Sequence, residues 1–263
     1  MNYPLVVDPR LIAKPWGGRR LKDFGITLPA NESIGEALLT AGEATVRNGP
    51  AAGRTLAEIV AADPFRAIGT RGLDAVGGRA IFPLLIKLID ATANLSIQVH
   101  PGFRAAAGDP SKTEAWHILA ADPGAVLYAG LRRDADPEAF AAACARATGD
   151  AAAYLRQMPA RVGATVLISA GTAHAIGAGV FLYEVQQPVD VTFRLDDWGR
   201  GDENGASREL HLEEGLAALA PESRPDPVAP STARGRRLLT ACHYFALERI
   251  ALAEGERADL RLE

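Results

Sequence analysis

The chain has 263 residues, of which 48% are hydrophobic and 23% are charged. It can therefore bury one large core or two smaller ones, and its composition fits no disordered class. A formal net charge of -4 and an isoelectric point near 5.8 argue against a broad nucleic-acid or anionic-membrane surface, although a small anionic ligand is still allowed.

Cysteine content and the N-terminal residues indicate the compartment. Cys144 and Cys242 are too few for a disulfide framework and lack zinc-knuckle spacing, which favours a reducing environment. Residues 1–5 have no basic start and no apolar signal core, and no apolar run reaches membrane-spanning length. We therefore expect a cytoplasmic protein that binds neither membrane nor nucleic acid, while its oligomeric state is not indicated.

The first helix is expected after a region of loops and edge strands. Residues 1–60 contain short apolar stretches that are interrupted by Pro and Gly. Thr55 and Glu58 have the spacing of a capping box, in which each side chain satisfies a backbone donor of the other. This pattern predicts a short helix from Thr55 to Ala62.

A helical insertion is expected at about residues 136–158. Asp136 is an acidic cap, a proline occupies the first helical position, and Gly149 is a stop after an alanine-rich run. Asp150 is expected to begin a further helix that continues through Gln157.

The other ordered segments have the features of strands. Short runs of apolar residues with frequent turns and no βαβ alternation imply an antiparallel sandwich or barrel, not a doubly wound sheet. The Pro-rich and charged segment 221–237 predicts a linker or long loop. The strands are expected at residues 82–89, 95–100, 115–120, 125–130, 165–169, 180–186, 189–195 and 243–250.

Two distant parts of the sequence contain potential metal ligands. Gln98 and His100 are two residues apart in a strand-like segment, so their side chains point to the same face. Glu114 and His174 supply a carboxylate and a second imidazole, and nitrogen and oxygen donors of this kind suit Zn²⁺ and tolerate Mn²⁺, Fe²⁺ or Co²⁺. A single buried histidine is more often a core residue with one hydrogen bond. Both histidines, however, lie where an apolar segment meets turn residues, which favours a metal site.

The segment 163–177 resembles the second motif of the cupin fold. Gly163, Ser169, Gly171 and His174 give the pattern Gly-x(5)-Ser-x-Gly-x-x-His, with Ser169 where Pro is usual. In this motif a glycine turn lets a strand deliver its histidine into the barrel. The expected fold is therefore mainly β, a cupin-type jelly-roll barrel with inserted short helices.

Five sequence blocks, in order, resemble the type I mannose-6-phosphate isomerases, also called phosphomannose isomerases. They include Gln-Val-His-Pro, Lys-Thr-Glu-Ala-Trp and Gly-Thr-Ala-His, and fainter matches extend the resemblance from about residue 8 to about residue 250. The resemblance implies one divalent metal, with Zn²⁺ favoured, and ligands at Gln98, His100, Glu114 and His174. The blocks lie at residues 83–91, 95–101, 112–116, 170–177 and 183–194.

The resemblance also implies an aldose–ketose isomerase that interconverts mannose 6-phosphate and fructose 6-phosphate through an enediolate. Such a reaction needs a base, and Lys112, Glu184 and Asp190 are candidates among which the sequence does not choose. Asp190 shares a strand face with Arg194, which matches the family's active-site arginine; alternatively, the two form a structural ion pair. Lys87, Lys112 and Arg194 are candidate substrate-binding residues, although Lys87 could instead snorkel from the barrel edge.

Departures from the family pattern keep other functions open. Ala37 and Leu38 stand where the family usually has Ser-Trp, and family members continue into a fuller C-terminal β domain. We therefore expect a catalytic domain over 1–220, a linker over 221–237 and, over 238–263, a truncated C-terminal β segment that is the remnant of a second cupin-like domain. A non-catalytic sugar-phosphate-binding or regulatory cupin is the alternative. A metal-dependent oxygenase cupin is disfavoured by the Lys-Thr-Glu-x-Trp block.

Overall fold

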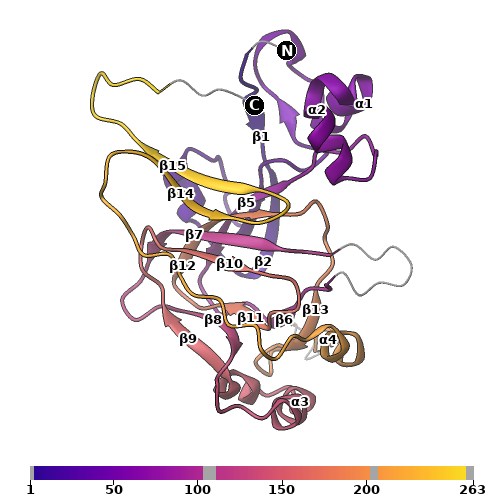
Figure 1. Cartoon of the computed structure of the whole chain (residues 1–263), viewed down its shortest axis with the longest axis vertical. Helices are drawn as coiled ribbons and strands as arrows, with labels where there is room; N and C mark the ends of the chain where they lie inside the picture. The colour runs from indigo at the N-terminus through magenta and orange to yellow at the C-terminus, as the bar shows by residue number, and fades with distance from the viewer. Residues whose placement is uncertain (1–2, 103–110, 202–206, 259–263) are drawn as a thin grey trace.

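The computed structural model describes residues 3–102, 111–201 and 207–258. Two antiparallel sheets form the body of the molecule (Figure 1). One has six strands in the order β10-β7-β12-β5-β2-β3 and the other has five in the order β13-β6-β11-β8-β9. Short helices lie outside the sheets, in agreement with the prediction of a mainly β fold that contains inserted short helices.

The six-stranded sheet combines strands from the N-terminal and central parts of the chain. Its strands are β2 (Arg10–Gly18), β3 (Ile34–Leu38), β5 (Leu85–Ala91), β7 (Glu114–Ala121), β10 (Thr165–Ile168) and β12 (Val180–Gln186). The five-stranded sheet contains β6 (Ile97–Val99), β8 (Val126–Leu131), β9 (Leu155–Pro159), β11 (His174–Ile176) and β13 (Phe193–Asp196).

Smaller elements surround these sheets. Two strand pairs are β1 (Val7–Asp8) with β4 (Thr45–Val46) and β14 (Gly235–Ala241) with β15 (Ala246–Ala251). The α-helices are α1 (Leu56–Ala62), α2 (Pro64–Ala75), α3 (Pro137–Arg146) and α4 (Leu212–Ala218), and the 3-10 helices are η1 (Arg20–Phe24), η2 (Gly49–Ala51) and η3 (Asp150–Tyr154). None of the helices in the described stretches has the length and apolarity needed to cross a bilayer.

The main core contains buried side chains from both sheets. Trp116, Ile118 and Leu182 from the six-stranded sheet belong to one cluster with Leu127 and Ile176 from the five-stranded sheet. Burial of such apolar surface is the principal stabilising term for a sandwich of this kind. The interior between the sheets therefore fixes the strands that carry the site.

The β14–β15 hairpin packs on the outer face of the six-stranded sheet. Phe245 from its turn is in one cluster with Ala115 of β7 and Val185 of β12. Because side chains alternate along a strand, the residues beside them, such as Trp116, point inward. The assignment of 238–263 to a remnant domain, of which 259–263 lie outside the described residues, stays a prediction.

The expected linker reaches the edge of the same sheet. Val228 exchanges two backbone hydrogen bonds with Thr165, with N···O distances of 2.7 and 3.1 Å. Gly235 then begins β14, so the last part of the segment 221–237 is strand.

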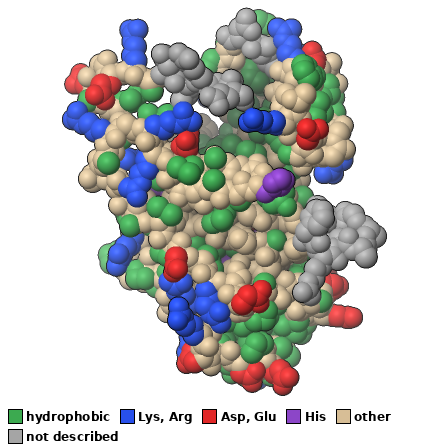
Figure 2. All heavy atoms as spheres, viewed as in Figure 1, with side chains coloured by type: hydrophobic (Ala, Val, Ile, Leu, Met, Phe, Trp, Pro, Cys, Tyr) green, Lys and Arg blue, Asp and Glu red, His purple; other side chains and the backbone are tan. Residues whose placement is uncertain are grey.

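Acidic and basic side chains are interspersed over the face of the molecule that Figure 2 shows.

Several expectations about elements need correction, and one helix was not expected. The helix expected from Asp150 through Gln157 is wrong, because only a 3-10 helix forms and β9 then pairs with β8, with Gln157 opposite Tyr128. This sheet pairing overrides the local helical signal. The strand expected over 189–195 begins only at Phe193, and the strand expected over 243–250 begins only at Ala246. The helix α2 was not expected, although Asp63 accepts from the Arg66 amide as its cap.

Candidate metal centre and cavity

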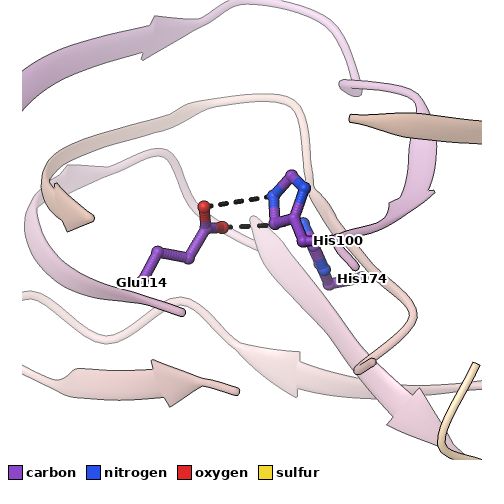
Figure 3. A group of neighbouring side chains, drawn as sticks. All are labelled: His100, Glu114 and His174. Carbon is purple, nitrogen blue, oxygen red and sulfur yellow. Dashed lines mark ion pairs between the residues drawn. The ribbon is translucent and has the colours of Figure 1, made fainter. Parts of the chain in front are cut away.

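Two histidines and one glutamate converge inside the sandwich. His100 follows β6, Glu114 begins β7 and His174 begins β11, and none of the three is more than 1% exposed. One ligand atom from each lies within 4.8 Å of the others. Figure 3 shows the Glu114 carboxylate directed at the two imidazoles: its oxygens lie 3.1 Å from His100 Nε2 and 3.5 Å from His174 Nε2.

Strand register and one glycine turn explain this convergence. His174 of β11 lies directly opposite Gln98 of β6. The turn before β11 contains Gly171, whose φ of +84° is favourable for glycine and strained for other residues. Its amide donates to the His100 carbonyl at 2.9 Å, which ties the turn to the other histidine.

Gln98 adds an amide to the cluster. Its Nε2 lies 3.2 Å from His174 Nε2, and its Oε1 accepts from the Ser96 hydroxyl at 3.2 Å. A rotation of 180° about the last side-chain bond exchanges the nitrogen and the oxygen of an amide. Gln98 can therefore present its oxygen to a cation. The four residues expected as ligands are therefore brought together.

The electrostatic environment keeps both imidazoles neutral. Burial, reinforced by the Lys112 ammonium, lowers the pKa of His100 to about 3. Burial also lowers the pKa of His174, whose Nδ1 lies 2.8 Å from the Thr172 carbonyl. The Nδ1–H donates there, so that the Nε2 lone pair faces the cluster.

The carboxylate of Glu114 stays ionised because its neighbours outweigh the effect of burial on its pKa. Burial alone would raise its pKa, but contact with the His100 imidazole and the positive charge of Lys112 hold the pKa well below its ordinary value. Lys112 Nζ lies 3.4 Å from a Glu114 oxygen. Neutral imidazoles and an ionised carboxylate are the protonation states that a metal requires of its ligands.

Unpartnered polar atoms test whether the donor set fits a cation. Among the described residues, both ring nitrogens of His100 and both oxygens of Glu114 are buried without a hydrogen-bond partner. Such atoms are uncommon because leaving them unpaired is costly, and they commonly mark an ion or another bound group. Two imidazoles, one carboxylate and one amide fit a divalent metal with an open coordination position.

A cavity of about 400 Å³ opens beside the cluster. Gln98 and Lys112 line it and also contact the cluster, at His174 and Glu114 respectively, so the cavity and the cluster are continuous. Apolar lining from Trp16 completes its wall. A small polar molecule can therefore reach the buried donors.

Every residue expected for catalysis or substrate binding lines this cavity: Lys87, Lys112, Glu184, Asp190 and Arg194. Asp190 is exposed, whereas Lys112 and Glu184 are buried. Within the described part of the chain, Asp190 is not among the charged groups that act on Arg194, and no ion pair joins the two. Instead, Arg194 Nη1 donates to the Glu209 carbonyl at 2.6 Å.

Lys87 is buried and does not snorkel to solvent. Its Nζ lies 3.2 Å from Glu184 and 3.6 Å from Glu36, which also pairs with Lys14 at 3.2 Å. Burial alone would lower the pKa of Lys87, but the carboxylates of Glu184 and Glu36 raise it. The other oxygen of Glu184 accepts from the Trp116 indole at 3.0 Å.

The pKa of Glu184 is raised, although neighbouring groups act on it in opposite directions. Burial and the nearby Glu114 raise its pKa, while Lys87 and Lys112 oppose them. A buried carboxyl with a raised pKa in a cleft is a frequent feature of catalytic sites.

Two sources of cavity residues were missed by reading the sequence. Arg10, Ile12 and Lys14 of β2 line the cavity, and Arg208 reaches it from the segment before α4. The signal for β2 was its alternation of every second residue, which the interrupting Pro and Gly residues obscured. Arg208 has no local signal beyond the faint family match.

Comparisons with known proteins agree with the geometry. No family model matches the chain. It is 35% identical over 227 residues to a mannose-6-phosphate isomerase of Streptococcus mutans, covering 83% of this chain and 68% of the relative. It is 33% identical over 256 residues to a mannose-6-phosphate isomerase of Bacillus subtilis, covering 93% and 78%.

Solved structures give the same result for the fold. A mannose 6-phosphate isomerase structure from Bacillus subtilis has a TM-score of 0.77 and 28% identity, covering 93% of this chain and 79% of that chain. A mannose 6-phosphate isomerase with zinc bound has a TM-score of 0.70 and 16% identity, covering 93% and 82%. The expected cupin-type fold and the family resemblance are both confirmed.

Proposed function

The chain belongs to the mannose-6-phosphate isomerase family, and from this premise we propose that it is a metal-dependent aldose–ketose isomerase acting on mannose 6-phosphate and fructose 6-phosphate. One observation carries the proposal: His100, Glu114 and His174 converge with unpartnered buried atoms at a cavity lined by Lys112 and Arg194. This arrangement combines a metal centre with cationic groups that suit a sugar phosphate.

We assign the metal to Gln98, His100, Glu114 and His174, with Zn²⁺ favoured by the mixed nitrogen and oxygen donors. A divalent cation at this position supplies Lewis-acid polarisation of the sugar oxygens. The Thr172 carbonyl keeps His174 in the required tautomer.

Proton transfer belongs to the buried part of the cavity. Isomerisation removes the proton at C2 and delivers one to C1, so the base must lie near the reacting carbons and away from bulk water. Lys112 and Glu184 meet this condition, whereas Asp190 is exposed to solvent. We therefore assign removal of the C2 proton and its return to C1 to the Glu184 carboxylate, with the Lys112 ammonium stabilising negative charge on the sugar oxygen.

The phosphate group is assigned to the cationic part of the cavity wall. Arg10, Lys14, Arg194 and Arg208 line the cavity, and guanidinium groups donate in pairs to phosphate oxygens. Lys87 is buried between two carboxylates, Glu184 and Glu36, whereas Arg10, Lys14 and Arg208 each pair with one carboxylate and are more exposed. The contribution of Lys87 to substrate binding is therefore the placement of Glu184.

A coupled assay tests the activity. The zinc-loaded protein should convert mannose 6-phosphate to fructose 6-phosphate, and a chelator should abolish turnover until zinc is restored. Binding of sugar phosphate without turnover by the loaded protein would establish the non-catalytic alternative. The expectation of a cytoplasmic location and of no nucleic-acid partner rests on sequence charge and composition, and stays a prediction.

A further inference from the structure

The β14–β15 hairpin contacts the strand that carries the catalytic residues. We propose that Tyr244, in the hairpin turn, is a positioning residue that acts through Ser111 to hold Lys112 and Glu114 in place. The inference rests on the proposed function, because it concerns the residues assigned there to the metal and the substrate.

A chain of hydrogen bonds links the two parts. The Tyr244 hydroxyl lies 3.1 Å from Ser111 Oγ, and Ser111 Oγ donates to Gln187 Oε1 at 3.2 Å. Because the Ser111 proton is used on Gln187, the Tyr244 hydroxyl is the donor to Ser111. The Thr113 amide donates to the same Gln187 oxygen at 3.0 Å.

These bonds fix the residues on both sides of Lys112. Ser111 and Thr113 are its chain neighbours, and both bind Gln187 Oε1. Glu114, the first residue of β7, is paired with Ile168 of β10 and Gln186 of β12, whereas Lys112 precedes the strand and lacks this support. The placement of Lys112, with Nζ 3.4 Å from a Glu114 oxygen, therefore depends on contacts that precede the strand, which also include the bond from the Lys112 amide to the Pro101 carbonyl.

The hairpin turn is a firm support for this contact. Phe245, next to Tyr244, is 8% exposed and packs with Ala115 and Val185 on the outer face of the sheet. The Cys242 amide donates to the Phe245 carbonyl at 2.9 Å and closes the turn. One hydroxyl thus connects an element outside the sandwich to residues within it.

Tyr244→Phe and Ser111→Ala test the proposal, together with the double variant. Each removes one hydroxyl, and the expected result is a weakening of zinc affinity by about fivefold, the usual effect of one hydrogen bond. A fall in kcat should accompany it, with little change in KM. The double variant should resemble Ser111→Ala, because that substitution already removes the contact with Tyr244 as well as the bond to Gln187. Zinc affinity is measured by chelator competition on the full chain.

Tyr3→Phe is the matched control. Its hydroxyl accepts from the Ala51 amide at 3.0 Å, in the N-terminal region, and it does not line the cavity. An equal loss of zinc affinity in this control would overturn the proposal. So would a Tyr244→Phe protein whose melting temperature falls while zinc affinity and kcat stay unchanged, since that marks a purely structural role. Zinc binding by the wild type without turnover would refute the proposed activity and leave the affinity comparison valid.

Discussion

Arg194 lines the cavity, and its guanidinium has one donor that is bonded to the protein and another that is not. Its Nη1 donates to the Glu209 carbonyl at 2.6 Å, while its Nε is buried without a hydrogen-bond partner. Burial and the nearby Arg208 lower its pKa, although a guanidinium stays protonated at neutral pH. An anion at this position would pair the remaining donor and offset the repulsion.

Arg194→Lys should therefore impair the enzyme even though charge is kept. An ammonium cannot hold the Glu209 carbonyl and also present planar donors to a substrate. We expect kcat/KM to fall by about tenfold or more, the value of one charge-assisted hydrogen bond. Steady-state kinetics check this, with Arg146→Lys on the exposed side of α3 as control. Unchanged kinetics would remove Arg194 from the substrate site.

At this scale the sequence predicts the metal ligands better than the cavity wall. Gln98 and His100 could be paired by strand alternation, and Glu114 and His174 by the family blocks. Arg10 and Arg208 reach the cavity only through the tertiary fold, so the sequence around either residue contains no pattern that predicts its place there. The contact of Tyr244 with Ser111 spans 133 positions and could not be inferred from either segment.

The ion-pair network around Lys87 belongs to the scale of elements, because it connects three neighbouring strands. Lys87 on β5 lies directly opposite Glu184 on β12, and Glu36 comes from β3. The raised pKa means that the folded state binds the lysine proton more tightly than the unfolded state. The stabilisation is therefore complete below the unfolded value of 10.5 and is lost as the pH rises through the folded value.

Lys87→Met should lower the free energy of unfolding by about 3–5 kcal/mol at neutral pH, because it leaves the buried Glu184 carboxylate without its cation, while Glu36 keeps Lys14. Urea unfolding with a measured midpoint checks this. Arg47→Met is the control, since Arg47 and Asp8 form an exposed pair that contributes little. Equal effects of both substitutions would contradict the buried network as a stabilising feature.

The elements also show where local signals fail. The Thr55 capping box and the Asp136 cap predicted α1 and α3 well, because both caps are satisfied within a few residues. The segment after Asp150 carries similar signals but pairs with β8 as β9. Helical propensity is a weak force compared with the pairing and burial of a strand, and the sequence near Asp150 does not encode its partner.

On the scale of the whole molecule, metal binding and folding are linked. The donors come from three strands that only the folded sandwich brings together, so the unfolded chain has no equivalent site. Free zinc at one hundred times its Kd should stabilise the protein by about 2.7 kcal/mol. Thermal melts with and without zinc measure this increase.

His174→Ala should abolish the zinc-dependent shift while the metal-free melting temperature changes little by comparison. His117→Ala is the matched control: His117 lies on the opposite face of β7, with Nδ1 2.8 Å from Thr165 Oγ1, and should keep the full shift. Stoichiometric zinc retained by the His174→Ala protein would contradict the assigned ligand set.

The facing of His174 and Gln98 has a consequence for how this chemistry could be lost. The alanines on either side of His174 belong to the apolar layer that includes residues of α3. Inserting a single residue into the short loop ahead of His174 would reverse the inward and outward sides of β11, burying the imidazole among aliphatic groups and placing a methyl beside the cation. A register shift of one residue in β11 would thus abolish metal binding without replacing any of the metal ligands.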